Sequence, residues 1–250
     1  QYMIQALVFA DSSNYHYRFQ TRGTGKYDAW SEYTHLGVSD MVPENELPSS
    51  NNFPEIIKYT SPDTLCTLVS SFQCLASVIT VGNYANDSGY VNNLNNWVST
   101  NTIRGKLSEN SSKGPTRIGL QKPDISASGD ITLSACRLDF IPFMNDSILA
   151  YGGLHMKNGG TSMASPVVAG IAALYLEKCH NSSSTKFKND LTNNAYSDSF
   201  TGNLPDYGFG YGKADAYATL VSSSFSPTIV NNEFCAGQDS TEVRTLLDYS

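Results

Sequence analysis

A serine at the start of a long helix of small and apolar residues constrains this chain more than any other feature. Gly160 and Thr161 precede Ser162, and Pro166 and Gly170 follow within a pattern that predicts a tightly packed helix. Proline fits the first turn because its missing N–H would have no helical acceptor there. The first turn leaves backbone N–H groups unpaired and carries partial positive charge. A serine hydroxyl in this position therefore has an oxyanion donor beside it.

Local chemistry alone leaves two interpretations of this segment. Ser162 is either the nucleophile of an acyl-transfer mechanism or part of the polar N-terminus of an ordinary core helix. Composition narrows the class of protein further. The 250 residues include 16 Lys and Arg against 23 Asp and Glu, a net charge of −7 that argues against binding nucleic acid. With 40% hydrophobic and 16% charged residues, and no apolar run near 18 residues, we expect a folded chain without a membrane span.

The segment from Gly160 to Gly170 resembles, without a gap, the G-T-S-M-A-S-P nucleophile motif of the subtilisin-like serine proteases. Other segments resemble further motifs of that family in the family's order: Ser77–Gly82, Ser111–Thr116, Lys122–Gly129 and Tyr207–Ala216. Ser128 stands where the family usually has Pro and Val167 where it often has His, both on supporting structure. The resemblance implies an α/β fold, the C-terminal half of a subtilisin-like parallel-sheet domain, over residues 76–222.

The resemblance also implies a catalytic triad in the chain order Asp, His, Ser. Nothing before Ser162 resembles the family's D-[ST]-G or H-G-T-H segments. The four histidines, for which we expect surface or structural roles, are His16, His35, His155 and His180. The asparagine that supplies the family's second oxyanion donor has one candidate, Asn14, after the apolar run 4–10. A hairpin of strands 4–10 and 15–21 is the competing interpretation, and the pattern favours it.

The pattern of elements divides the chain into three parts. Residues 1–75 are predicted to be an antiparallel β insertion, 76–222 the catalytic portion with the nucleophile, and 223–250 the start of a following unit. Predicted strands lie at 4–10, 15–21, 26–31, 77–82 and 131–135, with a further strand at Ile125 and a hairpin at 148–153. Predicted helices cover 162–178, 184–196 with Ser184 or Thr185 as cap, and a segment after Gly212.

The cysteines and the N-glycosylation triplets do not determine the cellular compartment of the protein. The five cysteines, Cys66, Cys74, Cys136, Cys179 and Cys235, include no C-x-x-C pair and no His at zinc-ligand spacing, which argues against a metal site. Free buried thiols are one interpretation, and a Cys66–Cys74 bridge in an exported chain is the other. The four N-x-S/T triplets are expected by chance in a chain so rich in Asn and Ser.

These observations lead to one principal hypothesis and one rival. We expect a secreted, extracellular or cell-surface subtilisin-like endopeptidase as the parent, whose protein or peptide substrate acylates Ser162, with the catalytic Asp and His outside this chain. This chain alone is expected to be inactive. No cofactor is evident, and calcium enters only through the family resemblance. The rival is a pseudoprotease or adhesion module that retains the scaffold for binding, and the upstream sequence separates the two.

Overall fold

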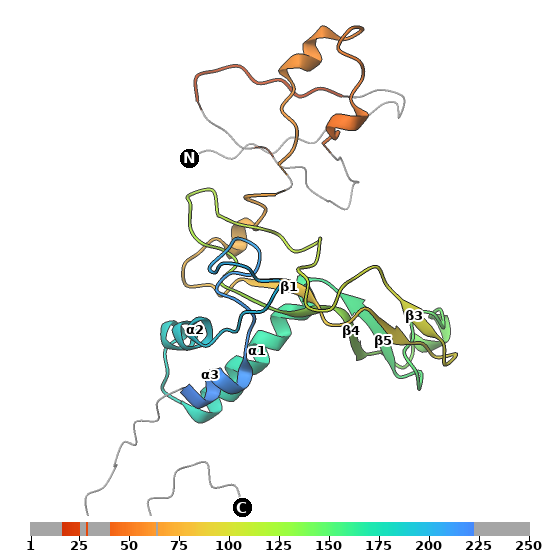
Figure 1. The fold of residues 1–250 in the computed structure, drawn as a ribbon, viewed down its shortest axis with the longest axis vertical. Coiled ribbons are helices and arrows are strands. Elements are labelled where there is room, and N and C mark those ends of the chain that lie inside the picture. Colours follow the sequence, from red (N-terminus) through yellow and green to blue (C-terminus); the bar gives the residue numbers. More distant parts are fainter. Residues whose placement is uncertain (1–16, 26–28, 30–40, 64, 223–250) are drawn as a thin grey trace, which may run out of the picture. The chain divides into compact units, whose positions relative to one another are not determined.

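A small mixed sheet covered by the helix of Ser162 forms the centre of the compact unit that begins at residue 63. The structure, a computed structural model, describes residues 17–25, 29, 41–63 and 65–222. The sheet has the strand order β1-β4-β5 (Figure 1). β1 (Val81–Ala85) runs parallel to β4 (Ile125–Ala135), and β4 runs antiparallel to β5 (His155–Gly159). Parallel strands followed by helices confirm the predicted α/β class.

β1 begins and ends later than the strand predicted at 77–82. On the side away from β4, two of its residues form hydrogen bonds with the loop that contains Lys106 and Ser108. Ser108 N–H donates to the Asn83 carbonyl at 2.9 Å, and Ala85 N–H donates to the Lys106 carbonyl at 3.0 Å. These contacts with a chain segment some 20 residues away extend the strand past Gly82. A local apolar pattern does not contain that information.

β4 joins the two predicted strand fragments, Ile125 and 131–135, into one strand with an irregular middle. The register against β1 shifts after Tyr84, so that Gly129 has no partner, and the register against β5 shifts between Asp130 and Thr132. Ile131 has a φ of 55° there, a left-handed conformation that β-branched residues rarely adopt. The bulge bends the strand where it meets the start of the Ser162 helix.

Three α-helices accompany the sheet within the described residues of this unit. α1 (Thr161–Lys178) confirms the predicted long helix, and α2 (Ser184–Asn193) and α3 (Ala216–Ser222) confirm the other two. The core under α1 consists of Val81, Ile125, Ala127, Ala164, Val168, Ile171, Tyr175, Phe187 and Leu191. The predicted cap of α2 is wrong by one residue, because Ser183 Oγ accepts from Lys186 N–H at 3.1 Å.

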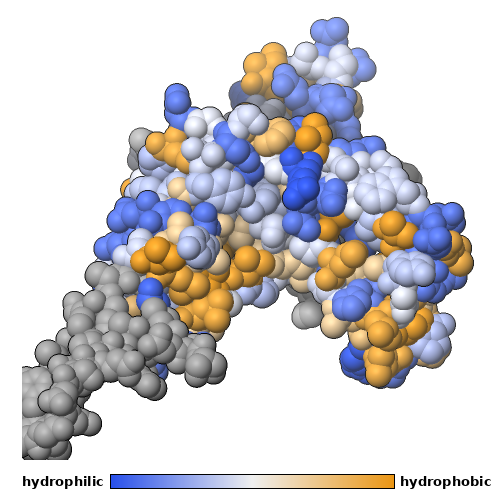
Figure 2. Space-filling view, turned by 60° about the horizontal axis from the view of Figure 1, so that its bottom comes forward, coloured by the Kyte–Doolittle hydropathy of each residue, from blue (hydrophilic) through white to orange (hydrophobic). Residues whose placement is uncertain are grey.

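A segment without usable periodicity, within 83–110, pairs with the predicted hairpin at 148–153 to form a lobe beside β5. β2 (Gly89–Val91) and β3 (Trp97–Ser99) form an antiparallel hairpin. Asn93 N–H donates to the Leu149 carbonyl, and Tyr151 N–H donates to the Val91 carbonyl, both at 2.9 Å. The predicted hairpin at 148–153 is confirmed, since Ala150 N–H donates to the His155 carbonyl at 2.8 Å. Figure 2 shows apolar side chains gathered on this lobe and on the ends of α1 and α3.

The chain divides into two compact units, residues 1–62 and 63–250. The described residues before β1 contain only the short 3-10 helices η1 (Glu44–Glu46), η2 (Pro54–Lys58) and η3 (Ser71–Gln73), and η4 (Ile141–Phe143) lies later. The strand predicted at 15–21 is wrong in its described part, because 17–21 is exposed and irregular. The strands predicted at 4–10 and 26–31 lie outside the described residues, apart from Ala29. The insertion at 1–75 and the unit at 223–250 stay predictions.

Cys66, Cys74, Cys136 and Cys179 are free thiols, so the alternative Cys66–Cys74 bridge is not formed, and Cys235 lies outside the described residues. Among the described residues, no three His, Cys, Asp or Glu side chains gather as metal ligands would. None of the described helices combines the length and apolar character needed to cross a bilayer.

Candidate active site

Ser162 lies in the first turn of α1, directly after the sheet. β5 ends at Gly159, Gly160 is the N-cap, and the side chain of Ser162 is exposed. Gly160 has a φ of 119°, in the range that residues with a side chain rarely adopt. Its N–H donates to the Gly129 carbonyl at 2.7 Å, which attaches the entry of α1 to the β4 bulge. A rigid strand and a glycine turn therefore present the predicted nucleophile to solvent.

The first turn of α1 offers a free hydrogen-bond donor beside the hydroxyl. Met163 N–H donates to the Gly160 carbonyl at 2.9 Å, and Ala164 N–H lies 3.4 Å from the same oxygen. Within the described part of the chain no acceptor is found for the Ser162 N–H, as expected near a helix N-terminus. With the positive end of the helix dipole, this N–H can stabilise negative charge that develops next to Ser162 Oγ.

Two glycines let the bulge of β4 approach α1 and β5 closely. A Cβ on Gly129 would lie 2.7 Å from Ala164 N and 2.6 Å from Asn83 Oδ1. A Cβ on Gly159 would lie 2.4 Å from Asp130 Oδ1. Contacts this short do not occur between real atoms, so a side chain at Gly129 would move the first turn of α1, and one at Gly159 would displace the Asp130 carboxylate. These short distances explain why Gly129 and Gly159 are glycines more directly than a need for backbone flexibility does.

Asn83, which sequence analysis did not single out, lies beneath this turn. Its side chain is fully buried, and Nδ2 donates to Asn110 Oδ1 at 3.2 Å. Its Oδ1 is the one buried side-chain oxygen of the described residues without a hydrogen-bond partner. An unsatisfied buried acceptor lowers stability by about 1–3 kcal/mol. No local signal identifies Asn83, because its environment is created by Gly129 and by the start of α1.

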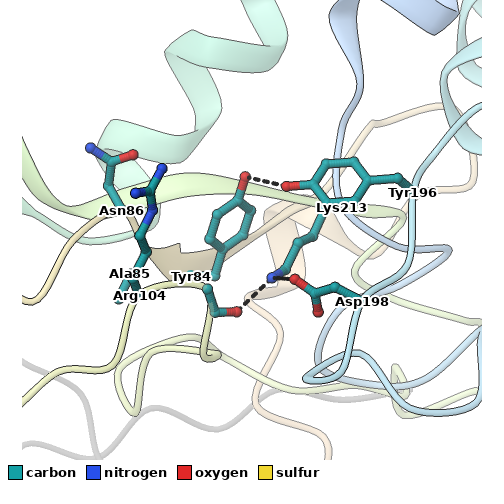
Figure 3. A pocket seen from close by; sticks show the side chains of 8 residues that line it. Tyr84, Ala85, Asn86, Arg104, Tyr196, Asp198 and Lys213 are labelled. Atoms are coloured by element: carbon teal, nitrogen blue, oxygen red, sulfur yellow. Dashed lines mark hydrogen bonds and ion pairs between the residues drawn. The ribbon is translucent and has the colours of Figure 1, made fainter.

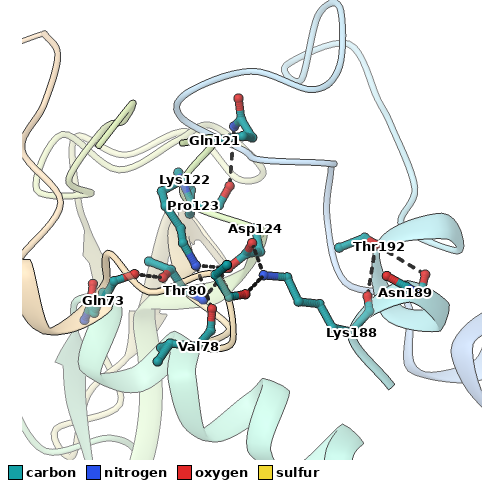
Figure 4. Close-up of polar contacts among 11 residues, drawn as sticks. Gln73, Val78, Thr80, Gln121, Lys122, Pro123, Asp124, Lys188, Asn189 and Thr192 are labelled. Atoms are coloured by element: carbon teal, nitrogen blue, oxygen red, sulfur yellow. Dashed lines mark hydrogen bonds and ion pairs between the residues drawn. The ribbon is translucent and has the colours of Figure 1, made fainter. Parts of the chain in front are cut away.

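A buried charge cluster holds the start of β1, the start of β4 and α2 together (Figure 4). Lys122 Nζ donates to Asp124 Oδ2 at 2.7 Å and to the Val78 carbonyl at 2.6 Å. Thr80 N–H donates to the same carboxylate oxygen at 2.7 Å, and Lys188 Nζ pairs with Asp124 Oδ1 at 2.7 Å. The Lys-Pro-Asp segment noted in the sequence is thus structural: it fixes the register of the strands that support α1. Lys188, 64 positions away from Asp124, gave no sequence signal.

The other end of α1 is held by a second polar group. Tyr175 OH donates to Asp190 Oδ2 at 2.6 Å, and Lys186 Nζ pairs with that oxygen at 2.7 Å. Burial works to raise the pKa of Asp190, but the hydrogen bonds from Lys186 and Tyr175 prevail and hold it below its ordinary value. Burial, together with the neighbouring carboxylate, raises the pKa of Tyr175. Asp190 therefore stays ionised and attaches α2 to α1.

The described histidines lie far from Ser162. His155 begins β5, and at about 3.3 Å per residue its Cα is about 13 Å along the strand from Gly159. His180 follows the C-terminus of α1, about 24 Å along the helix axis from Ser162 at 1.5 Å per residue. Neither can act as its general base, in agreement with the roles expected for them. His16, His35 and the candidate Asn14 lie outside the described residues, and so stay untested.

Solved structures of proteases resemble part of the chain. The CspB protease of Clostridium perfringens is 26% identical with a TM-score of 0.43, and the match covers 64% of this chain and 30% of that one. Fervidolysin of Fervidobacterium pennivorans, described as a keratinolytic enzyme related to subtilisin, is 28% identical with a TM-score of 0.40, over 58% and 19% of the two chains. This chain therefore spans under a third of either protein.

Sequence comparison gives the family. An uncharacterized protein of Aquifex aeolicus (strain VF5), aq_aa18, is 41% identical over 73 residues, which are 29% of this chain and 33% of that protein. The profile of the subtilase family, peptidase S8, matches residues 49–212, which is well over half of the chain. The matched range includes the motifs noted in the sequence from Ser77 onward, the last of them up to Gly212. The match also includes Ser162 and the Lys-Pro-Asp segment. The chain belongs to the subtilase family.

Proposed function

We propose that this chain is the nucleophile-bearing part of a serine endopeptidase and that Ser162 is the catalytic nucleophile. The observation that carries the proposal is the exposed Ser162 hydroxyl beside its own unpaired N–H, at the first turn of a helix fixed to the sheet by the Gly160–Gly129 hydrogen bond. Subtilase membership supports a peptide substrate. The fit of the first turn to an oxyanion supports acyl transfer as the reaction.

In this proposal Ser162 Oγ attacks the carbonyl carbon of the scissile peptide bond. Its proton passes to a histidine imidazole, which then gives it to the leaving amine as the C–N bond breaks. Water hydrolyses the resulting ester and restores the hydroxyl. The Ser162 N–H donates to the oxyanion of each tetrahedral intermediate. An aspartate orients the histidine and remains ionised throughout.

We assign the histidine and the aspartate to a part of the parent protein outside this sequence. No segment of this chain has the family's Asp or His motif, and the two described histidines lie far from Ser162. The uncovered apolar side of α1 supports a further chain segment against this helix. Val167 and Leu174, seven positions apart and therefore on one side of α1, are 41% and 51% exposed, whereas a helix that is apolar on all sides is usually buried. Secretion of the parent belongs to the same proposal.

Labelling with a fluorophosphonate tests the proposal. A longer protein that includes the upstream segment should label at Ser162, and Ser162→Ala should abolish the labelling, because alanine has no hydroxyl with which the fluorophosphonate can react. Ser165→Ala is the matched control, because Ser165 is exposed in the same helix and should be dispensable.

Two outcomes would contradict parts of the proposal. Labelling of the 250-residue chain alone, at the rate of the longer protein, would refute the assignment of the general base to another segment. Absence of labelling in a folded longer protein would refute the peptidase and favour the rival, a binding module that retains the subtilase scaffold.

A further inference from the structure

A cavity of about 300 Å³ lies on the side of β1 that faces away from α1. Val81 packs under α1, and successive side chains of a strand alternate between faces, so Tyr84 points to the opposite face. Four segments distant in sequence line the cavity: Tyr84–Asn86, Arg104–Gly105, Tyr196 with Asp198, and Lys213 (Figure 3). Its volume is at the lower end of the range for small-molecule sites.

The buried lysine of the cavity is already neutralised. Lys213 is 1% exposed, and its Nζ lies 2.5 Å from Asp198 Oδ2 and 2.6 Å from the Gly105 carbonyl. The Tyr84 ring centroid lies 4.5 Å from the same Nζ. Burial works to raise the pKa of Asp198, but the hydrogen bond from Lys213 prevails and lowers it. The ion pair leaves neither group available for a ligand.

Arg104 is the uncompensated charge of the cavity. No hydrogen bond or ion pair of its guanidinium is found among the described residues, and Figure 3 shows it beside the Asn86 side chain. The Tyr84 and Tyr196 hydroxyl oxygens lie 3.5 Å apart, so one of the two hydroxyl protons remains free to donate. Burial raises the pKa of Tyr84, which keeps that hydroxyl protonated at neutral pH. Free donors and one net positive charge face the same space.

We propose that this cavity binds a small carboxylate of about the size of an N-acylated amino acid. The guanidinium of Arg104 presents a planar pair of donors that matches the two oxygens of a carboxylate. The free hydroxyl proton of the Tyr84–Tyr196 pair donates to the same group, and the Asn86 amide lies beside the guanidinium. One net positive charge in the cavity matches a monoanion. The site is independent of the proposed peptidase reaction and requires no residue of α1.

The test is a titration of the 250-residue chain followed by amide NMR. The probes are N-acetylglycine and N-acetylglycinamide, which have nearly the same shape but differ in charge. We expect N-acetylglycine to shift the Gly105 and Asn86 signals in a saturable manner and the amide to leave them unchanged. Arg104→Gln should weaken the acid's affinity at least tenfold, whereas Arg22→Gln, which alters an exposed arginine of the other unit, should not change it.

Tyr196→Phe provides a second variant. Because Tyr196 is 41% exposed, the loss of its hydroxyl should not prevent folding. It should weaken binding of N-acetylglycine about threefold or more, because the hydroxyl that remains, that of Tyr84, belongs to the more buried of the two residues. Equal shifts by the acid and the amide would overturn the proposal. So would unchanged affinity in both Arg104→Gln and Tyr196→Phe. Inorganic phosphate should compete weakly, and preferential binding of phosphate would refute the carboxylate assignment.

Discussion

Replacing Asp124 with Asn should strongly destabilise this chain, although the two side chains have nearly the same volume. Asp124 lies between two ammonium groups, and the side chains of Asp124 and Lys122 are 5% and 0% exposed. Asn keeps the volume but removes the negative charge, which leaves Lys122 buried and uncompensated. Removing one partner of a buried ion pair lowers stability by about 3–5 kcal/mol. We therefore expect a loss of about 4 kcal/mol in the free energy of unfolding.

Urea unfolding followed by circular dichroism measures this loss. At an m-value of about 2 kcal/mol/M, a loss of about 4 kcal/mol lowers the midpoint by about 2 M. Lys186→Met is the control, because it breaks an ion pair that is nearer the surface. The side chains of Lys186 and Asp190 are 43% and 20% exposed, so the variant should lower the free energy of unfolding by at most about 1 kcal/mol.

A second substitution separates the stranded charge from other effects of Asp124→Asn. Lys122→Met in the Asp124→Asn background removes the uncompensated ammonium, so the double variant should regain stability relative to Asp124→Asn alone. A urea midpoint of Asp124→Asn within about 0.3 M of that of the unmutated chain would refute the reasoning. A double variant less stable than Asp124→Asn alone would also refute it.

Two further predictions concern α1. Gly129→Ala places a Cβ 2.7 Å from Ala164 N and should lower stability by about 1–3 kcal/mol in urea unfolding. Gly170→Ala, which meets nothing within 4 Å in the same helix, should instead raise it by up to about 1 kcal/mol. The lowered pKa of Asp190 provides stability that is present above its ordinary pKa of 3.8 and is lost as pH falls through the lower folded value. Thermal unfolding of Asp190→Asn should lack that decline below pH 4, and an unchanged decline would refute the assignment.

Elements with a strong local pattern were predictable. α1 has a glycine turn, an early proline and a run of small apolar residues, and the structure begins it within one residue of the prediction. β1 begins and ends later than the predicted strand at 77–82, because its later residues form hydrogen bonds with Lys106 and Ser108. These partners are too far along the chain to enter a local sequence pattern. The lobe of β2 and β3 was missed altogether, since its stability comes from pairing with residues near Leu149.

By itself, the sequence determined the family, the α/β class and the position of Ser162 at the start of a helix. These are properties of contiguous segments, in which residue type and spacing act over a few positions. Only the tertiary structure showed why Gly129 must lack a side chain, how Lys188 completes the Asp124 cluster, and that Arg104 lines one cavity with Tyr84 and Tyr196. Those contacts join residues far apart in the chain, and burial and charge have consequences only once folding has brought such residues together.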